Sequence, residues 1–365
     1  MRCFRSTYRD RECKKCKTSK WYIEFKDHLR LMRRLPAFTD KRQSEALGRQ
    51  IEKLVACKVS WEQPDAQLAR WLECVPAGMR ERFTKIGLID ASRAAAGKLL
   101  SEHIADFKQS LLDKGDSRKQ AQQTASRVRF IVDDCGFLAW TDIAASRVQR
   151  SIARTREAKG WSKKTANGHL KAIQHFARWM VQNRRASESP LAHLKAEKVR
   201  KYVDEEHPRR AIEIDELRRL LQITKAGPMC YGMSGYGRYL LYRLACECGL
   251  RANELRSLKI LSFDFNRLTV RVSAAYTKNK QEAVQQIRPD TAEELKQFLA
   301  GKMPNVKAFG GTYKRLTDKT HLLIKADLQA AGIPYVKDGQ YFDFHSLRHQ
   351  TGTLLAAAGV SPKTA

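Results

Sequence analysis

The sequence lacks the features of a membrane or secreted protein. Its longest apolar runs, such as LLAAAGV, are far too short to span a bilayer, and no apolar stretch follows the basic amino-terminal residues as in a signal peptide. The nine cysteines are an odd number spread along the chain, which argues against a disulfide scaffold. Internal repeats and low-complexity tracts are also missing. We therefore expect a cytoplasmic protein with reduced thiols and no membrane partner.

Negative charge is scarce in this sequence. Only 39 residues are Asp or Glu, against 69 that are Lys or Arg, and the formal net charge is +30. A metabolic enzyme normally has a mixed-sign surface, so this excess indicates a polyanionic partner, with nucleic acid as the first candidate. A basic but otherwise ordinary protein is the alternative, because charge alone does not specify a partner.

The texture of the sequence changes along its 365 residues, a length that suits two or three domains. It predicts an α+β protein that is mainly α with small β-sheets. The expected parts are a basic β-rich module at 1–60, an amphipathic connector at 61–95, a helical domain at 96–195, a polar Pro-containing linker at 196–210 and a mixed α/β unit at 211–365.

The amino-terminal module has the alternation of a strand. Trp21, Ile23 and Phe25 alternate with polar neighbours, a second strand fits LRLMRRL, and Thr39 is placed to cap a following helix. Residues 1–58 hold seventeen Lys and Arg against seven Asp and Glu. A small basic sheet with a docked helix can lie on DNA with its strands in a groove. The alternative is a solvated basic face without a partner.

The ECKKC segment offers half of a zinc site. Cys13 and Cys16 have zinc-ligand spacing, and Cys3 and His28 are the residues nearby that could complete the set. No second CxxC or HxxxH follows. We therefore predict no metal here and expect these cysteines in a strand turn, while a zinc-containing nucleic-acid binder stays open as a weaker alternative.

The region 96–195 has the apolar spacing of amphipathic helices. Leu100, Ile104, Phe107 and Leu111 share one face of the first helix, and Ser117 opens the second. Side chains at helix starts and on opposite faces are expected to meet DNA phosphates. These DNA-binding candidates are Arg118, Lys119, Arg127, Lys163, Lys164, Thr165 and Lys171. Charge for solubility alone is the alternative.

Three segments, GLRANELRSL, AAYTKNKQ and FHSLRH, could carry chemistry. His345 and Arg348 face the same way at a helix start and together suit a phosphate. Arg251 follows a helix-ending glycine, and Glu254 could fix its guanidinium or cap its helix. Two converging arginines would neutralise charge in phosphoryl transfer, and Lys278 on a hairpin turn could protonate a leaving oxygen. Taken singly, each segment also has an ordinary structural explanation: a surface ion pair for Arg251 with Glu254, a solvated turn for Lys278, and a basic helix cap for HSLRH.

The order and spacing of these segments resemble the tyrosine recombinase family, the phage-type integrases. The resemblance covers the catalytic domain from about 210 to 365 and extends more weakly to 96–195, which is similar to the helical core-binding (SAM-like) domain. The basic β-rich module at 1–60 is similar to the arm-type DNA-binding modules of some integrases.

The resemblance implies a mechanism without metal or cofactor. Arg251 and Arg348 would hold the scissile phosphate, Lys278 would protonate the leaving 5′ oxygen, His345 would assist proton transfer, and Glu254 would support the site. A tyrosine would attack phosphorus and form a 3′-phosphotyrosyl link. The implied partners are double-stranded DNA and three further copies of the chain, in a tetramer that brings two sites together.

Two points stay open within this resemblance. Lys280 is a neighbouring candidate for the role of Lys278. The nucleophilic tyrosine of the family lies farther beyond the second arginine than the 17 residues that follow Arg348 here, and Tyr335 and Tyr341 precede His345. We therefore expect a fragment without the nucleophile, inactive for cleavage and weakened in assembly. The alternative function is a non-catalytic DNA-binding protein that occupies recombination sites.

Overall fold

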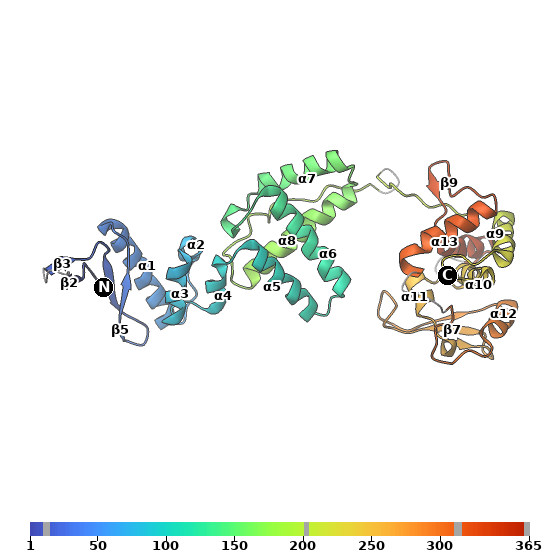
Figure 1. Ribbon diagram of the computed structural model, residues 1–365, viewed down its shortest axis with the longest axis horizontal. Coiled ribbons are helices and arrows are strands. Elements are labelled where there is room, and N and C mark those ends of the chain that lie inside the picture. The colour runs from blue at the N-terminus through green and yellow to red at the C-terminus, as the bar shows by residue number, and fades with distance from the viewer. Residues whose placement is uncertain (10–14, 201–203, 310–315, 361–365) are drawn as a thin grey trace. The chain divides into compact units, whose positions relative to one another are not determined.

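The computed structural model of the protein describes residues 1–9, 15–200, 204–309 and 316–360. The chain forms two compact units, Met1–Asp204 and Glu205–Ala365 (Figure 1). Both are mainly helical with small antiparallel sheets, as the sequence predicts. Within the described ranges, no helix combines the length and the apolar character needed to cross a membrane.

Short strands open the first unit. They are β1 (Arg2–Phe4), β2 (Thr7–Arg9), β3 (Lys15–Lys17), β4 (Tyr22–Lys26) and β5 (Met32–Pro36). β4 lies between β1 and β5 in one antiparallel sheet, and β2 pairs with β3 in a separate hairpin. The predicted second strand begins too early: Asp27 accepts hydrogen bonds from the amides of Leu29 and Leu31, which forms a turn, and β5 starts only at Met32.

The helix after this sheet, α1 (Lys41–Ser60), begins one residue later than predicted. Asp40, not Thr39, is its N-cap, because Asp40 has an extended backbone and its carboxylate accepts the amide of Gln43 at 2.7 Å. The helix ends at Trp61, which has a left-handed backbone (φ 60°).

The segment expected as a connector forms helices that complete the core of the amino-terminal module. These are α2 (Ala66–Cys74), α3 (Ala77–Lys85) and the short α4 (Ala91–Ala94). Leu68 of α2 and Phe83 of α3 are buried in one cluster with Ile23 of the sheet and Leu54 of α1. This core crosses the boundary expected at residue 60, so we propose that the first domain extends to about Ile89.

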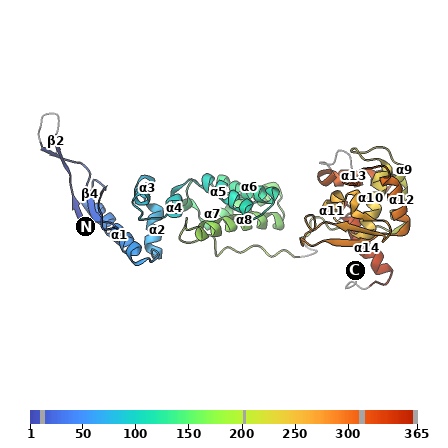
Figure 2. The same cartoon turned by 90° about the horizontal axis from the view of Figure 1, so that it is seen from below.

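Four longer helices form a bundle in the rest of the first unit: α5 (Leu100–Asp113), α6 (Arg118–Cys135), α7 (Ala145–Lys159) and α8 (Lys163–Gln182). Figures 1 and 2 show α8 packed among the other three. The predicted apolar face of α5 is buried, and Ser117 caps α6 as expected through its hydroxyl, which accepts the amide of Gln120 at 3.2 Å. Ser162 caps α8 in the same way.

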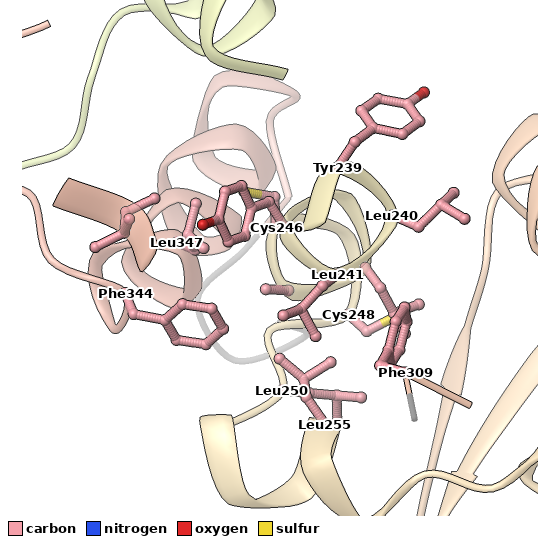
Figure 3. Packing of buried hydrophobic residues seen from close by; sticks show 14 of the residues in the cluster. Tyr239, Leu240, Leu241, Cys246, Cys248, Leu250, Leu255, Phe309, Phe344 and Leu347 are labelled. Carbon is pink, nitrogen blue, oxygen red and sulfur yellow. The ribbon is translucent and has the colours of Figure 1, made fainter. Parts of the chain in front are cut away.

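The second unit is built around α10 (Gly235–Cys248), which is buried on nearly every side. Its other elements are α9 (Ile214–Ala226), α11 (Ala252–Ser257), β6 (Phe263–Asp264), β7 (Thr269–Val272), β8 (Ala283–Gln286), α12 (Pro289–Leu299), α13 (Leu316–Ala330), β9 (Val336–Lys337), β10 (Gln340–Tyr341) and α14 (Ser346–Ala357). Figure 3 shows Phe344 and Leu347, from the start of α14, in the hydrophobic cluster beside α10. This packing fixes α14 against the central helix.

Candidate active site

Arg251 stands at a joint between two helices. α10 ends at Gly249, whose left-handed backbone (φ 61°) turns the chain, and Arg251 is the N-cap of α11. Glu254 contacts Arg251 twice: one carboxylate oxygen accepts the backbone amide at 2.8 Å and the other accepts Nη1 at 2.7 Å. The Glu254 side chain is only 5% exposed, against 42% for Arg251. The carboxylate therefore fixes a guanidinium that still reaches solvent.

Arg348 of α14 reaches the same joint. Its Nη1 donates to the carbonyl oxygen of Gly249, 99 residues earlier in the sequence. Burial lowers the pKa of Arg348, and the nearby charge of Arg251 lowers it further, while Glu254 acts in the opposite direction. Two guanidinium groups thus influence each other's charge with one carboxylate nearby, an arrangement that favours an anion.

His345 lies at the start of α14, next to Arg348 along the helix. Its ring meets that of His349 edge-on, with ring centroids 5.3 Å apart. Burial lowers the pKa of His345 below its ordinary value of 6.5, and the charges of Arg209, His349 and Arg348 add to this, whereas Asp343 opposes it. At pH 7 the imidazole is therefore neutral, with one nitrogen able to donate and the other able to accept.

The predicted lysines belong to the β7–β8 hairpin of the same unit. Lys278 and Lys280 are exposed in the turn between β7 and β8, where the Thr277 hydroxyl donates to the carbonyls of Ala274 and Gln281. Within the described part of the chain, neither lysine side chain forms a hydrogen bond or an ion pair. Both therefore remain candidates for the proton donor, and the structure does not separate them.

Five of the DNA-binding candidates lie on the surface of the helical bundle. Arg127 is half-buried against Gly168, where an added methyl group would come within 3.2 Å of the guanidinium carbon. The others are exposed: Arg118, Lys119, Lys164 and Lys171. Their ammonium and guanidinium groups face solvent, as a phosphate-binding surface requires.

The remaining two candidates are engaged within the unit. The ammonium of Lys163 forms an ion pair with Asp204 at 2.7 Å, so this lysine is not open as the sequence suggested. The hydroxyl of Thr165 accepts a hydrogen bond from Ser162 at 3.0 Å, and its amide donates to the same side chain. The start of α8 therefore carries a cap and a counter-ion of its own.

A polar cluster in front of α14 escaped the sequence-based search. Asp343 accepts hydrogen bonds from the guanidinium of Arg209 and also accepts the backbone amide of Ser346, the first residue of α14. The Ser346 hydroxyl in turn accepts the backbone amide of Asp343 at 3.1 Å, which makes a reciprocal cap. The only local signal is the D-x-x-S spacing of 343–346. Arg209 falls at the end of a predicted linker, where the sequence indicates no contact.

No metal centre emerges near the cysteines that the structure describes. Cys3 lies in β1 opposite Ile23, and Cys16 lies in β3 opposite Tyr8, while Cys13 falls outside the described residues. Across the described residues, no group of three or more His, Cys, Asp or Glu side chains is placed to hold a metal ion.

Comparison with known proteins connects this site to a family. Residues 210–365 match the model of the phage integrase family. A tyrosine recombinase of Pseudothermotoga lettingae is 21% identical over 223 residues, which cover 60% of this chain and 71% of that protein. The second unit, with its paired arginines, is thus a phage-type integrase domain. The match to the phage integrase family covers this unit, residues 210–365.

Solved structures agree in fold. A lambda integrase tetramer bound to a Holliday junction is similar over 98% of this chain and 93% of its own, with a TM-score of 0.58 and 12% identity. The Tn1549 transposon integrase in complex with a circular intermediate DNA is similar over 72% of this chain and 88% of its own, with a TM-score of 0.55 and 16% identity. At these identities the likeness shows the fold alone.

Proposed function

We propose that the protein acts in site-specific DNA recombination, binding duplex DNA and activating a phosphodiester for strand cleavage and rejoining through a 3′-phosphotyrosyl intermediate. The observation that carries the proposal is the convergence of Arg251 and Arg348, from distant segments, on the joint at Gly249, with Arg251 held by the buried carboxylate of Glu254. Like charges repel, and a fold that holds two guanidinium groups this close gains when an anion occupies the space between them.

The two arginines act on the phosphate. They neutralise its charge in the ground state and, more strongly, the extra charge that gathers on the non-bridging oxygens as the nucleophile attacks. Glu254 orients Arg251 and does not touch the substrate. In this scheme the tyrosine oxygen bonds to phosphorus as the bond to the 5′ oxygen breaks, and the leaving oxygen takes a proton from Lys278 or Lys280. His345, neutral at pH 7, donates a hydrogen bond to a phosphate oxygen or passes on a proton.

We assign the nucleophile to neither of the nearby tyrosines. Tyr341 stacks on His207 with ring centroids 3.6 Å apart, and Tyr335 packs edge-on against Tyr341. Both rings are thus engaged with each other and with His207. In residues 1–365 no tyrosine follows Tyr341. We propose that these residues bind DNA and activate the phosphate but do not supply the tyrosine.

The remaining parts serve DNA binding in this proposal. The module that extends to about Ile89 is an arm-type binding domain, residues 96–195 are a core-binding domain, and residues 211–365 carry the catalytic site. The similarity to a lambda integrase tetramer on a Holliday junction supports assembly of four copies on DNA. The second candidate function, a DNA-binding protein without catalysis, shares all of these parts except the chemistry at the arginines.

A rejoining assay tests the proposal without a protein tyrosine. A target duplex is first selected from a random-sequence pool by its affinity for the chain. It is then nicked so that one side ends in a 3′-(p-nitrophenyl phosphate) and the other in a 5′-hydroxyl. Attack of the 5′ oxygen on phosphorus joins the strand and releases p-nitrophenolate, an aryl oxide that stands in for the tyrosine oxygen.

We expect the chain to accelerate this rejoining, and Arg251→Ala and Arg348→Ala each to slow it by about 100-fold or more. Arg218→Ala, which removes an exposed pair with Asp215 in the same unit, serves as the matched control. Tight DNA binding with no rejoining above the uncatalysed rate would refute the catalytic proposal and leave the non-catalytic DNA-binding protein.

A further inference from the structure

The segment that enters the second unit is bonded to the strand in front of α14. The amide of Tyr341 donates to the carbonyl of Pro208 at 2.8 Å, and the amide of Arg210 donates to the carbonyl of Tyr341 at 3.0 Å. Arg209 and Tyr341 thereby form a parallel bridge. The sequence predicts residues 196–210 as a linker, yet its last residues are part of the folded second unit.

Arg209 binds Asp343, which lies three residues before the first residue of α14. Its Nε lies 3.0 and 2.9 Å from the two carboxylate oxygens of Asp343, and its Nη2 lies 2.9 Å from one of them. His207 adds a contact of 3.4 Å to the same carboxylate. Burial alone would raise the pKa of Asp343, but the hydrogen bonds and charge of Arg209 outweigh it and leave the pKa lowered. Asp343 is therefore a carboxylate, held by a bidentate cation.

Asp343 also forms hydrogen bonds with the first residue of α14, Ser346. Its Oδ1 accepts the amide of Ser346 at 3.0 Å and also accepts the Ser346 hydroxyl at 3.2 Å. Ser346 is fully buried. A carboxylate at a helix start also interacts favourably with the positive end of the helix dipole. The first turn of α14, which carries His345 and Arg348, is thus fixed through Asp343.

A second attachment lies one turn further along the same helix. Gln350 is 2% exposed, and its side chain pairs with the backbone of Ile212: its carbonyl oxygen accepts the Ile212 amide at 3.0 Å and its amide donates to the Ile212 carbonyl at 2.9 Å. His345 and Arg348 therefore lie between two points at which the entering segment 207–212 holds α14.

We infer that Arg209 and Asp343 are positioning residues of the phosphate site, which set the place of His345 and Arg348 by fixing the first turn of α14 to the entering segment. This inference rests on the proposed function. It assigns a role to the end of the linker. A displacement of that segment would also displace His345 and Arg348, because the ion pair of Arg209 with Asp343 joins the segment to the first turn of α14. Neither residue contacts the phosphate itself.

The kinetic test separates positioning from binding. In the rejoining assay, Arg209→Ala should lower kcat by roughly tenfold to 100-fold, with little change in the KM for DNA, because displacement of a reacting group slows chemistry more than it weakens binding. Arg209→Lys keeps the charge but loses the bidentate contact, so its kcat should be intermediate. The control Arg218→Ala should match the wild type. An Arg209→Ala protein with wild-type kcat, alongside inactive Arg251→Ala and Arg348→Ala proteins, would overturn the inference and leave the proposed function intact.

A spectroscopic test needs no DNA and no activity. The charged and titratable groups around His345 are Arg209, Asp343, His349 and Arg348. With ring-labelled histidine, and His345→Gln to assign its signal, the pKa of His345 should rise in Arg209→Ala and fall in Asp343→Asn. Opposite shifts are expected because the two partners carry opposite charges, whereas a general loosening of the fold would move both variants the same way. Shifts in one common direction would overturn the inference whether or not the wild type rejoins DNA.

Discussion

The helical bundle and the second unit use basic side chains in opposite ways. In the bundle, the basic side chains are dispersed and exposed to solvent at Arg118, Lys119, Lys164 and Lys171. In the second unit, Arg251 and Arg348 converge on one joint, where Arg251 pairs with the buried carboxylate of Glu254 and Arg348 donates to the carbonyl of Gly249. Dispersed charge contributes affinity that salt weakens, while convergent charge in a partly dry site stabilises one charged species far more strongly. In the proposed function, the same residue types therefore bind DNA in one region and take part in the reaction in the other.

The largest expected effect tests this contrast between dispersed and convergent basic side chains. Replacing Arg251 and Arg348 together by Ala should reduce rejoining at saturating DNA by about 100-fold to 1000-fold, with a smaller loss of affinity. Replacing Arg118 and Lys119 together by Ala should do the reverse, because in the proposed function these side chains bind DNA phosphates and take no part in the reaction. Rate at saturation and fluorescence anisotropy measure the two quantities. Equal loss of both quantities in both double variants would contradict the distinction.

The free energy of unfolding of the first unit should decrease at acidic pH. His103 of α5 is fully buried, and burial, followed by the charge of Arg185, lowers its pKa to about 4. Since the unfolded chain takes up this proton near pH 6.5 and the folded chain does not, stability is complete above pH 6.5 and falls as the pH drops toward 4. The loss should reach about 2–3 kcal/mol.

Denaturant unfolding followed by the fluorescence of the first unit's tryptophans measures this loss. His103→Leu should flatten the pH dependence between 6.5 and 4, while His193→Gln, an exposed control in the same unit, should leave it unchanged. A wild-type stability that is constant over this range would contradict the lowered pKa of His103.

A smaller effect is expected at the carboxylate beneath the arginines. Glu254→Gln leaves one acceptor oxygen for two donors, the Arg251 amide and Nη1. The second unit should lose about 1 kcal/mol of unfolding free energy, and rejoining should slow by roughly tenfold as Arg251 becomes less fixed. Glu293→Gln, an exposed change in α12, is the control. Rejoining at the wild-type rate would mean that Arg251 is held by the fold alone.

The smallest effect sharpens the description of the bundle. Removing one phosphate-contacting lysine should reduce the slope of log affinity against log salt by about one, and Lys164→Ala should show this in full. Lys163→Ala should change the slope less, because its ammonium is already paired with Asp204. Asp204→Asn should then raise affinity at low salt. Identical slopes for the two lysine variants would show that the Asp204 pair does not persist on DNA.

Local features of the sequence were enough to place much of the fold. Ser117, Ser162 and Gly249 mark helix ends because a cap depends only on residues within one turn. Arg251 with Glu254 is likewise a contact across three positions. The cap at Asp40 was missed by one residue, since Thr39 and Asp40 are both good caps and only the backbone conformation decides between them.

Contacts between distant segments could not be read in this way. Two ion pairs join the linker to residues far away in the sequence: Arg209 with Asp343, and Lys163 with Asp204. The local sequence around these residues does not indicate their partners. The core that unites Leu68 with Ile23 is also invisible locally, because an amphipathic helix shows that it has a buried face but not what covers that face.

Gly249 gives the phosphate site a thermal vulnerability. It ends α10 in a backbone conformation that other residues adopt only with strain, its carbonyl receives Arg348, and Arg251 follows two positions later. A side chain added at this position would also come within 3.4 Å of the hydroxyl of Thr351. Gly249→Ala, with a backbone penalty of about 1 kcal/mol, is therefore a natural design for a conditional variant that keeps the proposed rejoining activity at low temperature and loses it on warming.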